Sequence, residues 1–100
     1  MNMIFIKATL YKVASEKIKG FIDYLYVFVK KSQMQELNLS FEYAITKKDQ
    51  EVVSVLLVQR WTNKQAYEAF VTKEEFKKEF FTLKSFAKET SLVFEVTTAK

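Results

Sequence analysis

This chain of 100 residues contains no cysteine, no histidine and no proline, and only one glycine. Without cysteine it can form neither a disulfide nor a thiol nucleophile. Without histidine it cannot build a Ser-His-Asp site, and zinc has neither of its preferred nitrogen and sulfur ligands. The usual hydrolase and zinc-enzyme chemistries are therefore excluded by composition.

Flexible and apolar segments are also missing. With no proline and the single Gly20, no linker stands out, so residues 1–100 are expected to form one domain. No apolar run is long enough to cross a bilayer, and the first residues lack a basic region followed by a cleavage site. We therefore expect a cytoplasmic protein with no membrane partner.

Arginine is scarce, although the chain carries a net charge of +4. Arg60 is the only arginine, and the lysines are scattered among glutamates. Nucleic-acid readers favour arginine for bidentate contacts, and RRM-type modules place a characteristic aromatic motif on their sheet. That motif is absent. Of three functional hypotheses for the chain, a nucleic-acid-binding module is therefore the least favoured, and no nucleic-acid partner is expected.

The chain is rich in hydrophobic residues, at 49%, and their spacing predicts the first elements. Met3 to Val13 alternates as a strand does. Ser15 is the expected N-cap of a helix that ends around residues 32–35. Leu37 to Thr46 alternates again and predicts a second strand, followed by a polar turn at residues 47–50.

The longest apolar strand is expected from Glu51 to Trp61, which holds the only tryptophan. Its middle, Val55 to Val58, is apolar on both faces and predicts a central strand that is covered on both sides. Since the second and third strands are close in sequence, they are expected to form an antiparallel hairpin.

Two capping signals follow this strand. Thr62 with Gln65, and Thr72 with Glu75, match the capping box, so two helices in succession are predicted. Leu92 to Thr98 is expected to be the last strand. The order β-α-β-β-α-β predicts an α+β ferredoxin-like fold, with a four-stranded antiparallel sheet and helices on one face. Because the strands are apolar on both faces, the open face is predicted to close against a second copy, as a homodimer.

The chain resembles the antibiotic biosynthesis monooxygenase family, whose members are small dimeric α+β barrel proteins. The resemblance rests on I-F-I-K-A-T-L-Y-K-V, L-S-F-E-Y, the strand end Q-R-W-T-N, A-Y-E-A-F and E-E-F-K-K-E-F. It covers nearly the whole chain. It implies a dimeric barrel and, in one branch of the family, oxidation of quinols or polycyclic phenols by dioxygen without a cofactor.

Several positions depart from the family pattern. Gln59 stands where an acid is usual, Leu57 where some relatives have an amide, and Phe70 and Glu75 where histidines are common. Haem-degrading relatives bind iron through a histidine. This chain has none, so we expect no haem, no metal and no other cofactor.

The resemblance and the residue types together suggest a small site near Trp61. Trp61 either stacks on a flat ligand or fills the core at a strand end. Tyr67 is the candidate for proton transfer, unless it is only a half-buried helix aromatic. Lys7 and Thr9 share the mixed face of the first strand and are candidates for substrate binding. Phe70 and Phe76 are the candidate aromatic walls.

Two functions remain open at this point. The first is a cofactor-independent monooxygenase acting on a small aromatic or quinol substrate. The alternative is a non-catalytic ligand-binding or stress-related dimer on the same scaffold, which the missing histidines and Leu57 favour. Fold alone does not decide between them.

Overall fold

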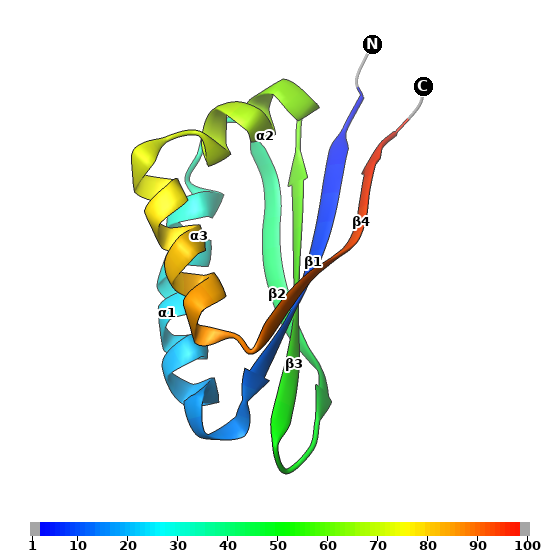
Figure 1. Cartoon of the computed structure of the whole chain (residues 1–100). Coiled ribbons are helices and arrows are strands. Elements are labelled where there is room, and N and C mark those ends of the chain that lie inside the picture. Colours follow the sequence, from blue (N-terminus) through cyan, green and yellow to red (C-terminus); the bar gives the residue numbers. More distant parts are fainter. Residues whose placement is uncertain (1–2, 99–100) are drawn as a thin grey trace.

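The computed structural model describes residues 3–98, and it shows four strands and three α-helices (Figure 1). In chain order the elements are β1 (Phe5–Ala14), a 3-10 helix (Ser15–Lys17), α1 (Ile18–Gln33), β2 (Asn38–Lys48), β3 (Val52–Trp61), α2 (Lys64–Val71), α3 (Glu74–Phe86) and β4 (Glu89–Thr97). The predicted order is confirmed, with the second helical segment divided into α2 and α3.

The four strands form one antiparallel sheet in the order β2-β3-β1-β4. All three helices lie against the same face of this sheet (Figure 1). The α+β ferredoxin-like prediction is therefore confirmed. The prediction that the third strand is central is also confirmed, because β3 pairs with β1 on one side and β2 on the other.

Strand alternation decides which side chains meet the helices. Tyr11 pairs with Val55 and Val13 pairs with Val53, and all four side chains are buried in the core. The intervening positions, such as Leu10 opposite Leu56, point to the open face. One face thus builds the core, whereas the other stays uncovered within a single chain.

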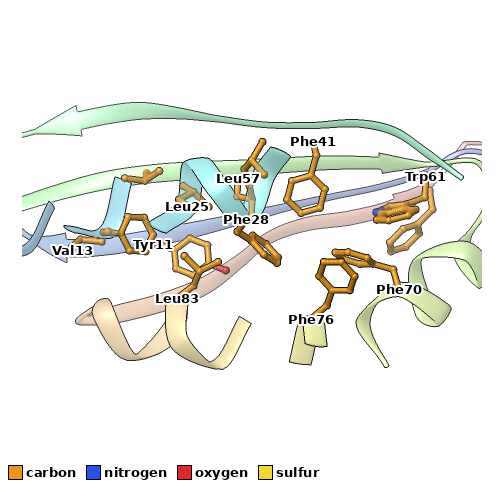
Figure 2. Close-up of a cluster of buried hydrophobic side chains, with 14 of the residues drawn as sticks. Tyr11, Val13, Leu25, Phe28, Phe41, Leu57, Trp61, Phe70, Phe76 and Leu83 are labelled. Atoms are coloured by element: carbon orange, nitrogen blue, oxygen red, sulfur yellow. The ribbon is translucent and has the colours of Figure 1, made fainter. Parts of the chain in front are cut away.

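The core between sheet and helices is mostly aromatic (Figure 2). Phe28 on α1 lies near its middle, with its ring centroid 4.8 Å from that of Phe80 and 5.6 Å from that of Phe41. Both contacts are edge-to-face, an arrangement that aromatic quadrupoles favour. This packing joins α1, α3 and β2.

The helix starts differ from the predicted capping pattern. Ser15 was expected to cap α1, but its hydroxyl donates to the carbonyl oxygen of Gln50 at 2.7 Å, and its N–H donates to that of Glu51. Ser15 therefore ties the end of β1 to the β2–β3 turn. That prediction was wrong because a tertiary contact satisfies the serine first.

The caps of α2 and α3 were also misplaced. Asn63, one residue after the predicted Thr62, is the N-cap of α2, and its Oδ1 accepts from Ala66 N at 2.8 Å. Thr72 was expected to cap α3, but its hydroxyl donates to the carbonyl oxygen of Glu68 at 2.8 Å and so closes the end of α2. The N-cap of α3 is Lys73, which makes no side-chain cap.

The β2–β3 hairpin is longer than expected, because β2 continues to Lys48. Asp49 makes the turn: its Oδ1 accepts from the N–H groups of Val52 and Glu51. These two hydrogen bonds lower the pKa of the Asp49 carboxyl.

Within residues 3–98, no helix is long and apolar enough to cross a membrane.

Candidate active site

A cavity of about 330 Å³ lies between the sheet and the helices α2 and α3. The strands contribute Lys7, Thr9, Tyr11 and Gln59. The helices contribute Tyr67, Val71, Lys77 and Phe80. Ligand pockets commonly measure roughly 300–1,000 Å³, so this volume suits a ligand of one or two rings.

Alternation in β1 explains why three of its polar side chains share this cavity. Lys7, Thr9 and Tyr11 are two residues apart and therefore point to the same side of the sheet. Across the sheet, Lys7 pairs with Gln59 on β3 and with Glu95 on β4. A row of three polar residues thus crosses the sheet beneath α2.

Lys7 and Tyr67 form the shortest polar contact of the cavity. Lys7 Nζ donates to the Tyr67 hydroxyl oxygen at 2.6 Å, and it lies 3.7 Å from Glu95 Oε1. The Tyr67 ring packs on Phe5 with a centroid distance of 4.8 Å, which orients the hydroxyl toward the lysine. The predicted candidates Lys7, Thr9 and Tyr67 are therefore brought together at one cavity.

Tyr11 supplies a second phenol to the cavity. It is only 3% exposed, and its ring lies 5.4 Å from that of Phe21. Burial, together with the nearby Tyr67, raises the pKa of Tyr11 to about 12. Tyr11 is therefore a neutral hydroxyl at ordinary pH, able to donate or to accept a hydrogen bond.

The other predicted residues lie in the core rather than on the cavity wall. Trp61, Phe70 and Phe76 are 1–2% exposed and pack on one another, with centroid distances of 4.6 Å from Phe70 to Trp61 and 4.4 Å from Phe70 to Phe76. Figure 2 shows the three gathered at one end of the core. Trp61 reaches the cavity only indirectly, because its Nε1 donates to Gln59 Oε1 at 2.9 Å.

Several lining residues were not among the sequence candidates: Tyr11, Gln59, Val71, Lys77 and Phe80. Tyr11 and Gln59 carried a usable signal, because each is two residues from a candidate on the same strand and so shares its face. Lys77 had no such signal. Its position depends on how α3 lies over the sheet.

The two positions where histidines were expected from the resemblance have structural roles here. Phe70 packs against Trp61 and Phe76 in the core. Glu75 lies at the start of α3, 3.0 Å from Lys31 Nζ on α1, and that lysine also pairs with Glu79 at 2.7 Å. Hydrogen bonds to these two carboxylates raise the pKa of Lys31.

In the part of the chain described, no group of three or more aspartates or glutamates could hold a metal ion.

A family model described as antibiotic biosynthesis monooxygenase matches residues 3–79. The chain belongs to this family. No curated protein sequence matches it. The family shows a monooxygenase-type fold for this chain, and every residue that lines the cavity except Phe80 lies within the matched range.

Solved structures agree with this family assignment at the level of the fold. A Nitrosomonas europaea protein assigned as an antibiotic biosynthesis monooxygenase has a TM-score of 0.80 at 12% identity, with coverage of 100% of this chain and 92% of that one. A structure named antibiotic biosynthesis monooxygenase gives 0.75 at 15% identity, covering 98% of each chain. A conserved protein from Methanosarcina mazei gives 0.77 at 15%, with 98% and 93% covered.

Proposed function

We propose that this family member is a cytoplasmic, homodimeric, cofactor-independent monooxygenase that oxidises a small phenol or quinol with dioxygen. The observation that carries the proposal is the Lys7–Tyr67 contact of 2.6 Å inside a cavity of about 330 Å³. The Tyr67 hydroxyl oxygen accepts from Lys7, so its own O–H remains free to meet a ligand hydroxyl. The ligand phenol gives electrons to dioxygen in its deprotonated form.

The residues have distinct roles in this proposal. Tyr67 is the catalytic residue that exchanges a proton with the ligand hydroxyl. Lys7 stabilises the oxygen that carries the negative charge, while Thr9 and Phe80 line the ligand site. Trp61, Phe70 and Phe76 support the site from behind, because Phe70 packs on the other two rings and Trp61 Nε1 donates to Gln59 Oε1.

The reaction balances with dioxygen as the only co-reactant. A phenol and dioxygen yield a quinone and water. One oxygen atom becomes the new carbonyl on a ring carbon, and the ring C–H and phenolic O–H bonds break. Four electrons pass from the ring to dioxygen, and the two hydrogens leave with the second oxygen atom as water.

Oxygen uptake by the purified chain tests this function. We expect uptake above the protein-free rate for at least one member of a panel of small phenols and quinols, with no added metal or flavin and in the presence of a chelator. Tyr67→Phe should lower the rate by roughly 10²- to 10⁴-fold, the usual contribution of general acid–base catalysis. Tyr26→Phe, on the exposed side of α1, is the matched control and should keep the rate. Equal rates for wild type and Tyr67→Phe would contradict the proposal.

A second function, a non-catalytic ligand-binding dimer, is favoured by one observation. Trp61, Phe70 and Phe76 fill the core against one another, so the tryptophan is not free to stack on a ligand. Ligand binding with no oxygen uptake across the panel would support this second function over the first.

The dimer is proposed to form through the open face of the sheet. Phe94 and Val96 on this face are 43% and 45% exposed, and they lie beside Ala8 and Ile6 in the sheet. Burying such a continuous apolar surface stabilises an assembly, and related family members are dimeric.

A lysine introduced into the open face of the sheet tests the dimer. Val58 faces this surface, because it pairs with Ala8. Val58→Lys should convert the dimer to a monomer in light scattering, since a lysine cannot be buried without a partner. Val27→Lys, at an exposed position of α1, should leave the mass unchanged. A wild-type monomer at micromolar concentration would exclude the proposed assembly.

A further inference from the structure

Gln59 is a buried amide whose orientation is determined by its neighbour. It is 1% exposed, and its Oε1 accepts from Trp61 Nε1 at 2.9 Å. An indole N–H can only donate, so the oxygen end of the amide must face Trp61. The NH₂ end is therefore directed away from Trp61, and Gln59 is one of the residues that line the cavity.

Within the described part of the chain, this NH₂ group has no protein acceptor. Among residues 3–98 the amide makes only the hydrogen bond to Trp61, and Nε2 makes none. Nε2 is not among the fully buried side-chain atoms that lack a partner, so this unbonded nitrogen is accessible from the cavity that Gln59 lines. A buried amide with two free N–H donors at a cavity wall is suited to receive an oxygen atom of a ligand.

The charges around Gln59 add to this preference. Lys7 is its neighbour across the sheet, and Lys77 enters the cavity from α3. Among the described residues that line the cavity there is no aspartate or glutamate. Glu95 lies on the other side of Lys7 from Gln59, with 3.7 Å between Lys7 Nζ and Glu95 Oε1. The charged groups of the lining are thus both cations, and the remaining polar groups are one amide donor and three hydroxyls.

We propose that the cavity selects an aromatic ligand bearing an oxyanion, a carboxylate or a phenolate, which is held by Gln59 Nε2 and the Lys7 ammonium, with Trp61 as the positioning residue for Gln59. This inference deepens the proposed function, because it concerns the same cavity. It does not need turnover, since binding alone tests it.

Three naphthalene probes separate charge from shape. 2-Naphthoate carries a carboxylate, 2-naphthamide is its neutral analogue of similar size, and 2-naphthol becomes a phenolate only at alkaline pH. We expect calorimetry to show that the wild-type chain binds 2-naphthoate roughly 10- to 100-fold more tightly than 2-naphthamide, the difference typical of a hydrogen bond to a charged group. Tighter binding of 2-naphthol at alkaline pH would add phenolates to the accepted ligands, whereas unchanged binding would restrict the site to carboxylates.

Gln59→Glu is the sharpest variant. It keeps an oxygen acceptor for Trp61 and the side-chain length, but replaces the two N–H donors with a negative charge. The affinity for 2-naphthoate should fall by roughly 10- to 100-fold, while that for 2-naphthamide should change little. Gln50→Glu, in the exposed β2–β3 turn, makes the same change of net charge away from the cavity and should bind both probes as the wild type does.

Trp61→Phe tests the positioning role. It keeps an aromatic ring in the core but removes the N–H that orients Gln59. The preference for 2-naphthoate over 2-naphthamide should shrink even where the variant remains folded by circular dichroism, a result that loss of packing alone would not produce.

Two results would overturn the inference. One is equal wild-type affinity for 2-naphthoate and 2-naphthamide, which needs no variant and so cannot be blamed on misfolding. The other is an unchanged 2-naphthoate affinity in a folded Gln59→Glu. Oxygen uptake is a separate measurement. Selectivity for the anion without oxygen uptake would support this inference and reject the monooxygenase. Oxygen uptake without selectivity for the anion would support the monooxygenase and reject this inference.

Discussion

The space between sheet and helices has two neighbouring regions that differ in how they are filled. In the aromatic region, Phe70 lies within 4.6 Å of the ring centroids of Trp61 and Phe76. In the adjoining region, beneath the same helices, Lys7 and Thr9 border a cavity of about 330 Å³. One region is close-packed, and the other is hollow.

The difference follows from the residues that the strands supply. On the helix-facing side of β3 and β2, Leu57 and Phe41 are large, apolar and fully buried. On the same side of β1, Lys7 and Thr9 are polar and only half-buried. Apolar side chains interdigitate to near-crystalline density, whereas polar side chains need hydrogen-bond partners, which a cavity can admit. Position in the sheet adds to this, because β1 is followed only by the edge strand β4, which is largely exposed.

The largest effect is expected when the filled region is emptied. Phe70→Ala should lower the free energy of unfolding by about 3–5 kcal/mol, because it removes a buried ring that contacts several others. Phe81→Ala is the matched control, since Phe81 is 73% exposed, and should change stability by less than about 0.5 kcal/mol. Chemical denaturation of both variants measures the difference. Similar losses in the two would show that the aromatic region is not close-packed.

Tyr11 lies at the border of the two regions and gives a pH-dependent prediction. Its pKa is about 12 in the folded chain and 10.0 without burial, so between these values only the unfolded chain loses the proton. The free energy of unfolding should therefore fall as pH rises through this window, by about 2–3 kcal/mol in total. Below pH 10 this contribution is fully present.

Tyr11→Phe tests that contribution by removing the titrating group. Denaturation between pH 9 and about 12 should show a shallower pH dependence for this variant. Tyr26→Phe, at a residue that is 52% exposed, should follow the wild type. Parallel curves for Tyr11→Phe and the wild type would mean that the Tyr11 hydroxyl is not desolvated.

The smallest effect is expected when the hollow region is filled. Thr9→Phe places a ring in the cavity and should change the free energy of unfolding by less than about 1 kcal/mol while abolishing ligand binding. Val55→Phe, at a fully buried core position, should cost about 1–3 kcal/mol through overpacking. Equal costs at the two positions in denaturation experiments would indicate that the cavity is not available to a side chain.

Much of the fold could be predicted from the sequence because it depends on local periodicity. The alternation of residues 3–13 indicated β1, and the long apolar run at 51–61 indicated β3, whose middle, Val55 to Val58, correctly indicated an interior strand. The caps were less predictable, since serine, threonine and asparagine compete for nearby backbone groups. Ser15 contacts the distant Gln50 instead of capping its own helix.

The candidate site was predicted in part. Lys7, Thr9 and Tyr67 do meet at one cavity, because two share a strand face and the third lies on the helix above them. Trp61, the first candidate from the resemblance and the residue types, fills the core, which was one of its two expected roles, and does not line that cavity. Whether a large aromatic at a strand end lines a pocket or is covered depends on the helix packed against it, and no local pattern encodes that.

The sequence by itself determined the order of the elements, which side chains share a face of β1 and of β3, and the absence of histidine and cysteine chemistry. These follow from side-chain identity and from periods of two or 3.6 residues. Only the tertiary structure decided which polar residues share a cavity and which way the Gln59 amide points. That orientation comes from one hydrogen bond to Trp61, two residues along the same strand, in a core that Phe70 closes from above. Burial makes such a contact decisive, because a buried donor and acceptor must be matched.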